Sequence, residues 1–265
     1  FVLWKMSKEN EPSWPSPWGA GRPGWHIECS VMATEILGDT IDIHGGGADL
    51  EFPHHTNEIA QSEAKTGKTF ANYWMHNGFV NVDNEKMSKS LGNFVTVHDM
   101  LQTVDGQVLR FFLATQQYRK PINFTEKAIH DAEVNLKYLK NTHSLPLTEQ
   151  VNQAELQTYL DAFQEAMDDD FNTANGVTVL FDMAKWINSG NYDQTVKDAF
   201  EKMLQVFGIV FEEEVLDEDI EKLIEERQAA RANKDFATAD RIRDELAAQG
   251  IKLLDTKEGV RWTRD

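Results

Sequence analysis

The stretch Thr40-Ile41-Asp42-Ile43-His44, followed directly by Gly45-Gly46-Gly47, reads as a short β-strand that runs into a glycine turn. Apolar residues at helical spacing predict a helix over 26–37 before it, and a second helix is predicted over 56–65. A further strand is predicted over 73–80. This order of strand, helix and strand predicts a parallel α/β sheet, with the glycines at the carboxyl end of a strand, where open sheets of this kind bind ligands.

From residue 97 onward the pattern becomes helical, beginning with the apolar run Val108 to Leu113. Asn123 or Thr125 could cap the next helix, because short polar side chains accept hydrogen bonds from the first free N–H groups. Later amphipathic stretches, with Phe163, Met167 and Phe181 as expected core residues, predict a helical bundle. Its helices are predicted over 156–167, 173–187 and 195–207.

The last fifth of the chain has a different charge pattern. Nine acidic residues and one lysine lie between Glu212 and Glu226, whereas residues 227–265 carry nine Lys/Arg and seven Asp/Glu. Two helices are predicted over 220–248 with a break near Asn233, followed by a small strand pair over 251–262. We therefore predict four segments: an α/β domain over 1–96, a helical bundle over 97–211, an acidic linker or helix start over 212–226, and a small α/β module over 227–265.

The composition narrows the class of protein. The chain has 265 residues, of which 41% are hydrophobic and 26% charged, and its net charge of −18 argues against broad electrostatic binding to nucleic acid. No apolar run reaches the ~18 residues that a membrane span needs. The single cysteine allows no intrachain disulfide, which fits a reducing cytoplasm. Phe1 to Trp4 reads as a strand already under way, so we expect the chain to be a piece of a longer one.

Three residues could bind a metal ion. His54 and Glu58 are four residues apart, so at the start of a helix both side chains project from one face. Cys29 ends a different element that could reach the same corner of the sheet. Thiolate, imidazole and carboxylate together suit zinc. His55 is the rival for the histidine position, and a lone Cys29 is otherwise most simply a buried small apolar residue.

The loop Lys86-Met87-Ser88-Lys89-Ser90, followed by Leu91-Gly92-Asn93, places two cations and two hydroxyl groups beside a glycine. Such a loop can move over a polyphosphate and supply positive charge. It resembles the KMSKS signature of the class I aminoacyl-tRNA synthetases, which activate an amino acid with ATP.

Several longer motifs extend the resemblance over essentially the whole chain. The chain is similar to the cysteinyl-tRNA synthetases in motifs that occur in the same order, which are Trp25-His26-Ile27-Glu28-Cys29-Ser30, Asp42 to Leu50, Phe52-Pro53-His54-His55-Thr56-Asn57-Glu58, Met167 to Thr173, Ala239 to Asp244 and Gly259-Val260-Arg261-Trp262. The resemblance implies the second half of a Rossmann-type domain, then a bundle that contacts the tRNA stem and is DALR-like, then an anticodon-binding domain.

The family's zinc is held by two Cys, one His and one Glu, and three of these map onto Cys29, His54 and Glu58. The fourth ligand, a cysteine, belongs to the family's N-terminal half and is missing here. The family's His-x-x-His signature has no match in the sequence either. The resemblance therefore implies a carboxyl-terminal portion of the enzyme, which we predict to be inactive alone.

The resemblance also assigns roles to residues. The intact enzyme would use ATP with Mg²⁺, L-cysteine and tRNA(Cys), pass through a cysteinyl-adenylate, and act as a cytoplasmic monomer. Trp25, His44 and Asp49 would contact the substrate cysteine, and Lys86 and Lys89 would be catalytic. The ATP-binding residues would be Gly46 and the loop residues Lys86, Met87, Ser88, Lys89 and Ser90. Arg261 and Trp262 would contact tRNA. For Trp262 the simpler alternative is a residue of a small core.

Two other functions share part of this pattern. A ligase of mycothiol synthesis, which joins cysteine to an amino sugar, would have the same zinc and KMSKS features, but it has no use for an anticodon module after about residue 216. A non-catalytic module that binds tRNA through residues 97–265 is the second alternative.

Overall fold

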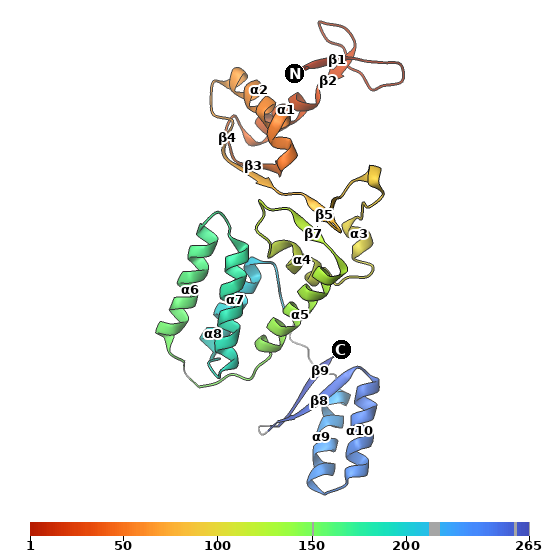
Figure 1. Ribbon diagram of the computed structural model, residues 1–265, viewed down its shortest axis with the longest axis vertical. Coiled ribbons are helices and arrows are strands. Elements are labelled where there is room, and N and C mark those ends of the chain that lie inside the picture. Colours follow the sequence, from red (N-terminus) through yellow and green to blue (C-terminus); the bar gives the residue numbers. More distant parts are fainter. Residues whose placement is uncertain (150, 212–217, 257–258, 265) are drawn as a thin grey trace. The chain divides into compact units, whose positions relative to one another are not determined.

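The computed structural model of the chain describes residues 1–149, 151–211, 218–256 and 259–264, and it divides into two compact units, Phe1–Phe211 and Glu212–Asp265 (Figure 1). The predicted acidic linker lies partly outside these described residues, since 212–217 are not among them. Within the described part of the chain, no helix has the length and apolar character needed to cross a membrane.

The first unit opens with a two-stranded antiparallel sheet of β1 (Trp4–Met6) and β2 (Gly21–Pro23). The proline-rich segment between these strands is irregular apart from an isolated bridge of Trp14 to Gly21, as expected from prolines that cannot donate to a ladder. Helix α1 (Trp25–Leu37) follows at once and confirms the helix predicted over 26–37.

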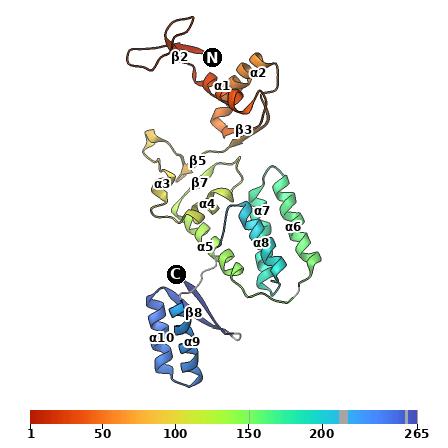
Figure 2. The ribbon, with the colours of Figure 1, turned by 180° about the vertical axis from the view of Figure 1, so that it is seen from behind.

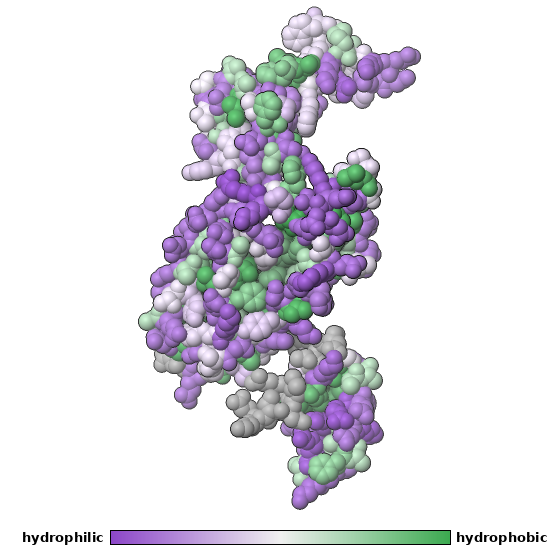
Figure 3. Space-filling model, in the orientation of Figure 1, coloured by the Kyte–Doolittle hydropathy of each residue, from purple (hydrophilic) through white to green (hydrophobic). Residues whose placement is uncertain are grey.

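Helix α1 packs on α2 (Thr56–Thr66) through polar residues, since Ser30 and Thr34 are its buried positions and the Ser30 hydroxyl donates to Gln61 Oε1 at 3.0 Å. Most of its large apolar residues are exposed, and hydrophobic residues are visible on the surface of the N-terminal part in Figure 3. The exposed large ones are Trp25, Val31, Met32, Ile36 and Leu37.

The predicted parallel sheet is present as the pair β3 (Ile41–Gly47) and β4 (Ala71–Asn77). The expected glycine turn was wrong, because β3 continues through all three glycines, with Gly45 paired to Met75 and Gly47 to Asn77. A side chain at Gly46 would meet the His55 ring at 3.0 Å, so this glycine is required by close packing. His44 therefore lies inside β3, paired with Trp74, and not at the end of a strand.

The single strand predicted over 73–80 is divided at Gly78. A Cβ at Gly78 would lie 2.3 Å from the backbone carbon of Lys120, and the Gly78 N–H donates to the Tyr118 carbonyl at 2.7 Å. After this crossing the chain enters another sheet, in which β5 (Val80–Val82) pairs antiparallel with β6 (Glu85–Lys86) and parallel with β7 (Ile122–Phe124). The loop after β6 contains the short helix η3 (Lys89–Leu91).

The remaining helices of this unit form the predicted bundle, in which α6, α7 and α8 lie side by side in both views (Figures 1 and 2). Thr125 caps α5, which decides between the two predicted caps, and its hydroxyl accepts from Ala128 N. The helices are α3 (Val97–Met100), α4 (Gly106–Ala114), α5 (Glu126–His143), α6 (Gln153–Asp168), α7 (Thr173–Asn188) and α8 (Gln194–Val206).

A single apolar core joins these helices. It contains Phe111, Leu139, Leu180, Phe200 and Leu204, all at most 2% exposed, together with Phe163 from α6. Met167 and Phe181, also predicted as core residues, pack against this cluster while remaining partly exposed.

The second unit is a helical hairpin followed by a strand pair. Helices α9 (Glu218–Ala232) and α10 (Phe236–Ala248) are separated at the predicted break, where the Asp235 side chain caps α10. Strands β8 (Ile251–Thr256) and β9 (Gly259–Arg264) pair antiparallel. Ile220, Ile242, Leu246 and Ile251 form a small core of this unit.

Because Leu204 is 2% exposed and belongs to the bundle core, we expect Leu204→Ala to lower the free energy of unfolding by about 2–5 kcal/mol. Val206→Ala on the same helix is the matched control, since Val206 is 56% exposed, and it should cost about 0.5 kcal/mol or less. Urea unfolding followed by circular dichroism measures both. Equal losses for the two variants would contradict the assignment of the core.

Candidate functional site

Three ligand-type side chains meet beside the carboxyl half of β3. Cys29 comes from α1, His54 from the short helical segment η2 (Glu51–His55), and Glu58 from the first turn of α2. The Cys29 Sγ, a His54 ring nitrogen and a Glu58 carboxylate oxygen all lie within 4.8 Å of one another. The structure thus brings together the three residues that the sequence selected as candidate metal ligands.

Glu58 is the most deeply buried of these side chains, with 1% of its surface exposed. One carboxylate oxygen lies 2.7 Å from His54 Nε2 and the other lies 3.0 Å from His44 Nε2. These distances are short, but neither carboxylate oxygen has a partner with hydrogen-bond geometry. The donor atoms therefore lie close together without forming hydrogen bonds to one another. A cation bound between them would provide the missing interactions.

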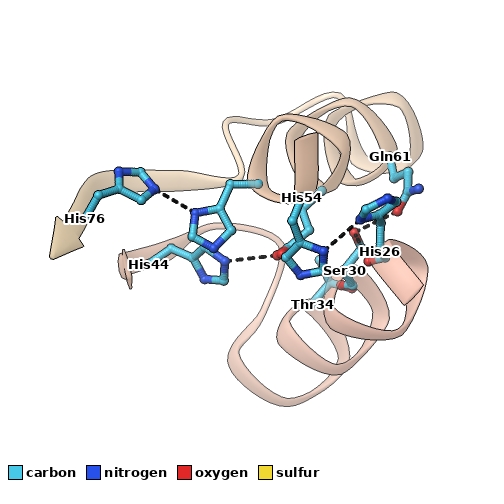
Figure 4. Close-up of polar contacts among 9 residues, drawn as sticks. His26, Ser30, Thr34, His44, His54, Gln61 and His76 are labelled. Atoms are coloured by element: carbon cyan, nitrogen blue, oxygen red, sulfur yellow. Dashed lines mark hydrogen bonds and ion pairs between the residues drawn. The ribbon is translucent and has the colours of Figure 1, made fainter. Parts of the chain in front are cut away.

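A second set of donors shares Glu58. His44, His55 and Glu58 also place ligand-type atoms within 4.8 Å of one another. His55 Nδ1 is hydrogen-bonded to His76 Nε2 at 2.8 Å, which leaves only Nε2 of His55 for a cation (Figure 4). The first set contains a sulfur ligand and the second does not, so the two sets differ in the cations they suit.

Burial controls the protonation of the site. It raises the pKa of Glu58 to about 7 and lowers the pKa of His55 to about 4, where the neighbouring His44, His76 and His54 add to the effect. Burial also lowers the pKa of His44 and of His54. Burial and the Glu58 and Glu28 carboxyls raise the pKa of the Cys29 thiol. The imidazoles are thus kept neutral at pH 7, which is the form that binds metal ions.

Aromatic rings enclose the donors on one side. The Trp25 ring stacks on the His54 ring with centroids 4.4 Å apart, and it is 56% exposed, so part of its surface stays open to a ligand. His26 Nδ1 lies 2.7 Å from His54 Nδ1 (Figure 4). Trp74 meets the His44 ring edge-on at 4.9 Å. His54 is consequently held by a ring face and by a hydrogen bond at the nitrogen that faces away from Glu58.

Asp49 lies just beyond β3, in the short helix η1 (Ala48–Leu50), and its side chain is exposed. A Cβ at Gly47 would lie 2.5 Å from Asp49 Oδ1, so a side chain at position 47 would clash with this carboxylate in its present position. The structure therefore places an open carboxylate two residues after the last glycine of β3.

In the Lys86–Ser90 loop, Lys86 and Ser90 are exposed and Met87 and Ser88 are partly buried. Lys86 Nζ lies 3.8 Å from the centroid of the Phe79 ring, as a cation–π contact. The Ser88 and Ser90 hydroxyls are 3.2 Å apart, and Met87 N–H donates to the Val80 carbonyl at 3.1 Å. The described hydrogen bonds of the loop thus join it to β5, to its own residues and to Asn93, while the Lys89 side chain lies outside the described part.

The two residues selected in the second unit lie on β9. Trp262 is partly buried against the core of Ile220, Ile242, Leu246 and Ile251, so part of its ring is committed to packing. The Arg261 side chain lies outside the described part of the chain.

Sequence reasoning missed His26 and His76, which bond to His54 and His55. A signal was present, because five of the eight histidines fall between residues 26 and 76. Such a concentration indicates a shared site, but the pairing within it depends on the fold.

Family models match three parts of the chain. Residues 1–134 match the tRNA synthetases class I (C) catalytic domain, residues 162–212 the DALR domain, and residues 213–262 the cysteinyl-tRNA ligase anticodon binding domain.

Similar proteins carry the name cysteine–tRNA ligase. One from Streptococcus thermophilus is 94% identical over 265 residues, one from Streptococcus pyogenes 84%, and one from Streptococcus agalactiae 81%. Each alignment covers 100% of this chain and 59% of the relative. The chain thus spans somewhat more than half the length of the curated relatives that it matches.

Binding of Co²⁺ distinguishes the two donor sets. We expect the chain to bind Co²⁺ with a thiolate-to-metal charge-transfer absorption, and Cys29→Ser to remove that absorption. Cys29→Ser and His54→Ala should each weaken binding by about 100-fold or more, since even the loss of an outer partner of a ligand costs roughly 10–100-fold. His55→Ala is the control and should leave the dissociation constant nearly unchanged. Loss of binding in His55→Ala but not in Cys29→Ser would assign the cation to the other set.

Proposed function

The chain belongs to the class I tRNA synthetase (C) family, and from this membership we propose that it forms part of a cysteine–tRNA ligase. The proposed enzyme activates L-cysteine with ATP and transfers it to tRNA(Cys). The observation that carries the proposal is the meeting of a sulfur, a nitrogen and an oxygen donor at Cys29, His54 and Glu58, within 4.8 Å of one another. The names of the similar ligases support it.

These three side chains fit a zinc ion. Zinc takes sulfur, nitrogen and oxygen ligands in tetrahedral sites, and the two Glu58 oxygens lack hydrogen-bond partners of their own. A bound Zn²⁺ would accept the substrate thiolate and would reject the harder, poorly ionised hydroxyl of serine. An apolar pocket alone separates substrates that differ by one small group by only about 10–200-fold. A donor set built around sulfur ligation accounts for a stricter choice.

The residues around the donors would orient the amino acid. Trp25 would form one wall of the pocket with the exposed part of its ring. The exposed Asp49 carboxylate would bind the substrate ammonium group, and His44, held beside Glu58, would contact the substrate from β3. The backbone of Gly46 would contact the nucleotide.

Lys86 and Lys89 would stabilise the α-phosphate while the cysteine carboxylate attacks and pyrophosphate leaves. Met87, Ser88 and Ser90 would complete the nucleotide contacts, with Mg²⁺ entering together with ATP. No covalent enzyme intermediate is required, because the protein contributes positioning and charge stabilisation. The exposure of Lys86 supports this role, since its ammonium group must reach a bound polyphosphate.

The second unit would recognise tRNA. Its match to an anticodon-binding domain supports this, and the same match favours the synthetase over a ligase of mycothiol synthesis, whose small amine substrate has no anticodon. Arg261 would supply a phosphate or base-edge donor, and the free part of the Trp262 ring would stack on an unpaired base. We place the enzyme in the cytoplasm as a monomer.

The assignment of Lys89 can be tested in a full-length synthetase that contains this segment. We expect Lys89→Ala to slow adenylate formation by about 10²–10³-fold, because it removes a donor to charge that develops in the transition state. The KM for cysteine should change little, since the thiol site is built from other residues. Pre-steady-state ATP–pyrophosphate exchange measures both quantities. An unchanged rate of adenylate formation would reject the role of Lys89 and weaken the proposed function.

A further inference from the structure

The Asn93 side chain makes two hydrogen bonds to the backbone of the loop that precedes it. Its Oδ1 accepts from Ser88 N–H at 2.9 Å, and its Nδ2 donates to the Lys86 carbonyl at 3.3 Å. These two backbone groups flank Met87 and point to the same side of extended backbone, which is how one strand presents itself to a parallel neighbour. The Asn93 amide therefore takes the place of a neighbouring strand.

The other side of the same segment is already paired. Lys86 pairs with Asn81 of β5, and Met87 N–H donates to the Val80 carbonyl at 3.1 Å. Residues 86–88 are thus held between β5 on one side and the Asn93 amide on the other. Without Asn93, the side away from β5 would lose both of these partners.

The return of the chain to Asn93 depends on the turn between them. The helix η3 (Lys89–Leu91) starts at once after the extended segment, and Leu91 N–H donates to the Ser88 hydroxyl at 3.3 Å. Gly92 then has a φ of 69°, a left-handed conformation that glycine adopts without strain. The chain thus turns back on itself between Ser88 and Asn93, and the hydrogen bonds of the Asn93 side chain hold the two ends of this turn together. We call this arrangement the Asn93 ring.

We propose that Asn93 is a positioning residue for the nucleotide chemistry of this loop, an inference that rests on the proposed function. Its amide fixes where the strand that carries Lys86 ends and where the turn that carries Lys89 begins. The spacing of the two lysine backbones is thereby set before a nucleotide binds. Charge stabilisation of a phosphoryl transition state depends on donors that are already in place, so a loop with a variable register would stabilise it less.

Amide hydrogen exchange tests the ring in the 265-residue chain itself. We expect Asn93→Ala to accelerate exchange at the Ser88 N–H by about threefold to tenfold, as fits the loss of one hydrogen bond. Asn93→Asp should have a smaller effect at Ser88, because a carboxylate oxygen can still accept from this N–H. Asn141→Ala, which removes an exposed amide from α5, is the matched control and should change nothing at Ser88. Unchanged exchange in Asn93→Ala would overturn the proposal.

Kinetics of a full-length synthetase that contains this segment tests the positioning role. We expect Asn93→Ala to lower the kcat of ATP–pyrophosphate exchange by about 10- to 100-fold with an unchanged KM for cysteine, because misplaced donors cost transition-state stabilisation and not substrate binding. Asn93→Asp should fall between Asn93→Ala and the unsubstituted enzyme. Faster amide exchange with an unchanged kcat would show a purely structural contact and overturn the proposal.

The Lys89→Ala enzyme distinguishes failure of the role proposed for Asn93 from failure of the nucleotide function proposed for the loop. If Lys89→Ala slows adenylate formation and Asn93→Ala does not, only the role of Asn93 fails. If neither substitution changes the rate, the nucleotide function proposed for the loop fails, whatever the Ser88 amide exchange shows.

Discussion

The burial of the Glu58 carboxyl is the constraint on which the candidate site depends. A carboxylate that is 1% exposed is costly unless opposite charge or hydrogen bonds compensate for its lost hydration. Here two histidine nitrogens lie within 3.0 Å of its oxygens without forming hydrogen bonds to them, and its pKa is raised to about 7. A cation between Cys29, His54 and Glu58 would remove this cost and would favour the ionised carboxylate and thiolate together.

The fold assembles this site from short local elements, and those elements were predictable. Helical spacing identified α1 and α2, and alternation with glycine identified β3, because each pattern depends only on neighbours in the chain. The i, i+4 relation of His54 and Glu58 was predictable for the same reason, although the helical segment η2 intervenes before α2. The chemistry of Cys29 made it a candidate ligand, but whether its thiol reaches His54 and Glu58 depends on how α1 packs on α2, which the sequence does not show.

The features that sequence reasoning missed are all non-local. β3 extends through its three glycines because β4 pairs with each of them. The predicted strand is interrupted at Gly78 because the backbone of Lys120, which lies 42 positions later in the chain, passes next to it. His26 contacts His54, which is 28 positions away in the sequence, and His55 contacts His76, which is 21 positions away. The spacing of residues along the chain does not show which distant residues come into contact. The number of histidines could therefore indicate a cluster, but not which histidines are hydrogen-bonded to each other.

The two halves of the proposed chemistry are built in different ways, and the difference follows from what each must bind. The proposed donors for a thiol are the buried His54 and Glu58 and the partly buried Cys29. The Trp25 ring stacks on His54, which suits a choice between two small substrates that differ by one atom. Lys86 and Ser90 of the lysine loop are exposed, as suits a loop that is proposed to admit and release a highly charged nucleotide. Closing that loop through one side-chain amide fixes the backbone that carries both lysines. The proposed function would thus combine rigid recognition of the amino acid with a locally ordered phosphate loop in one short polypeptide.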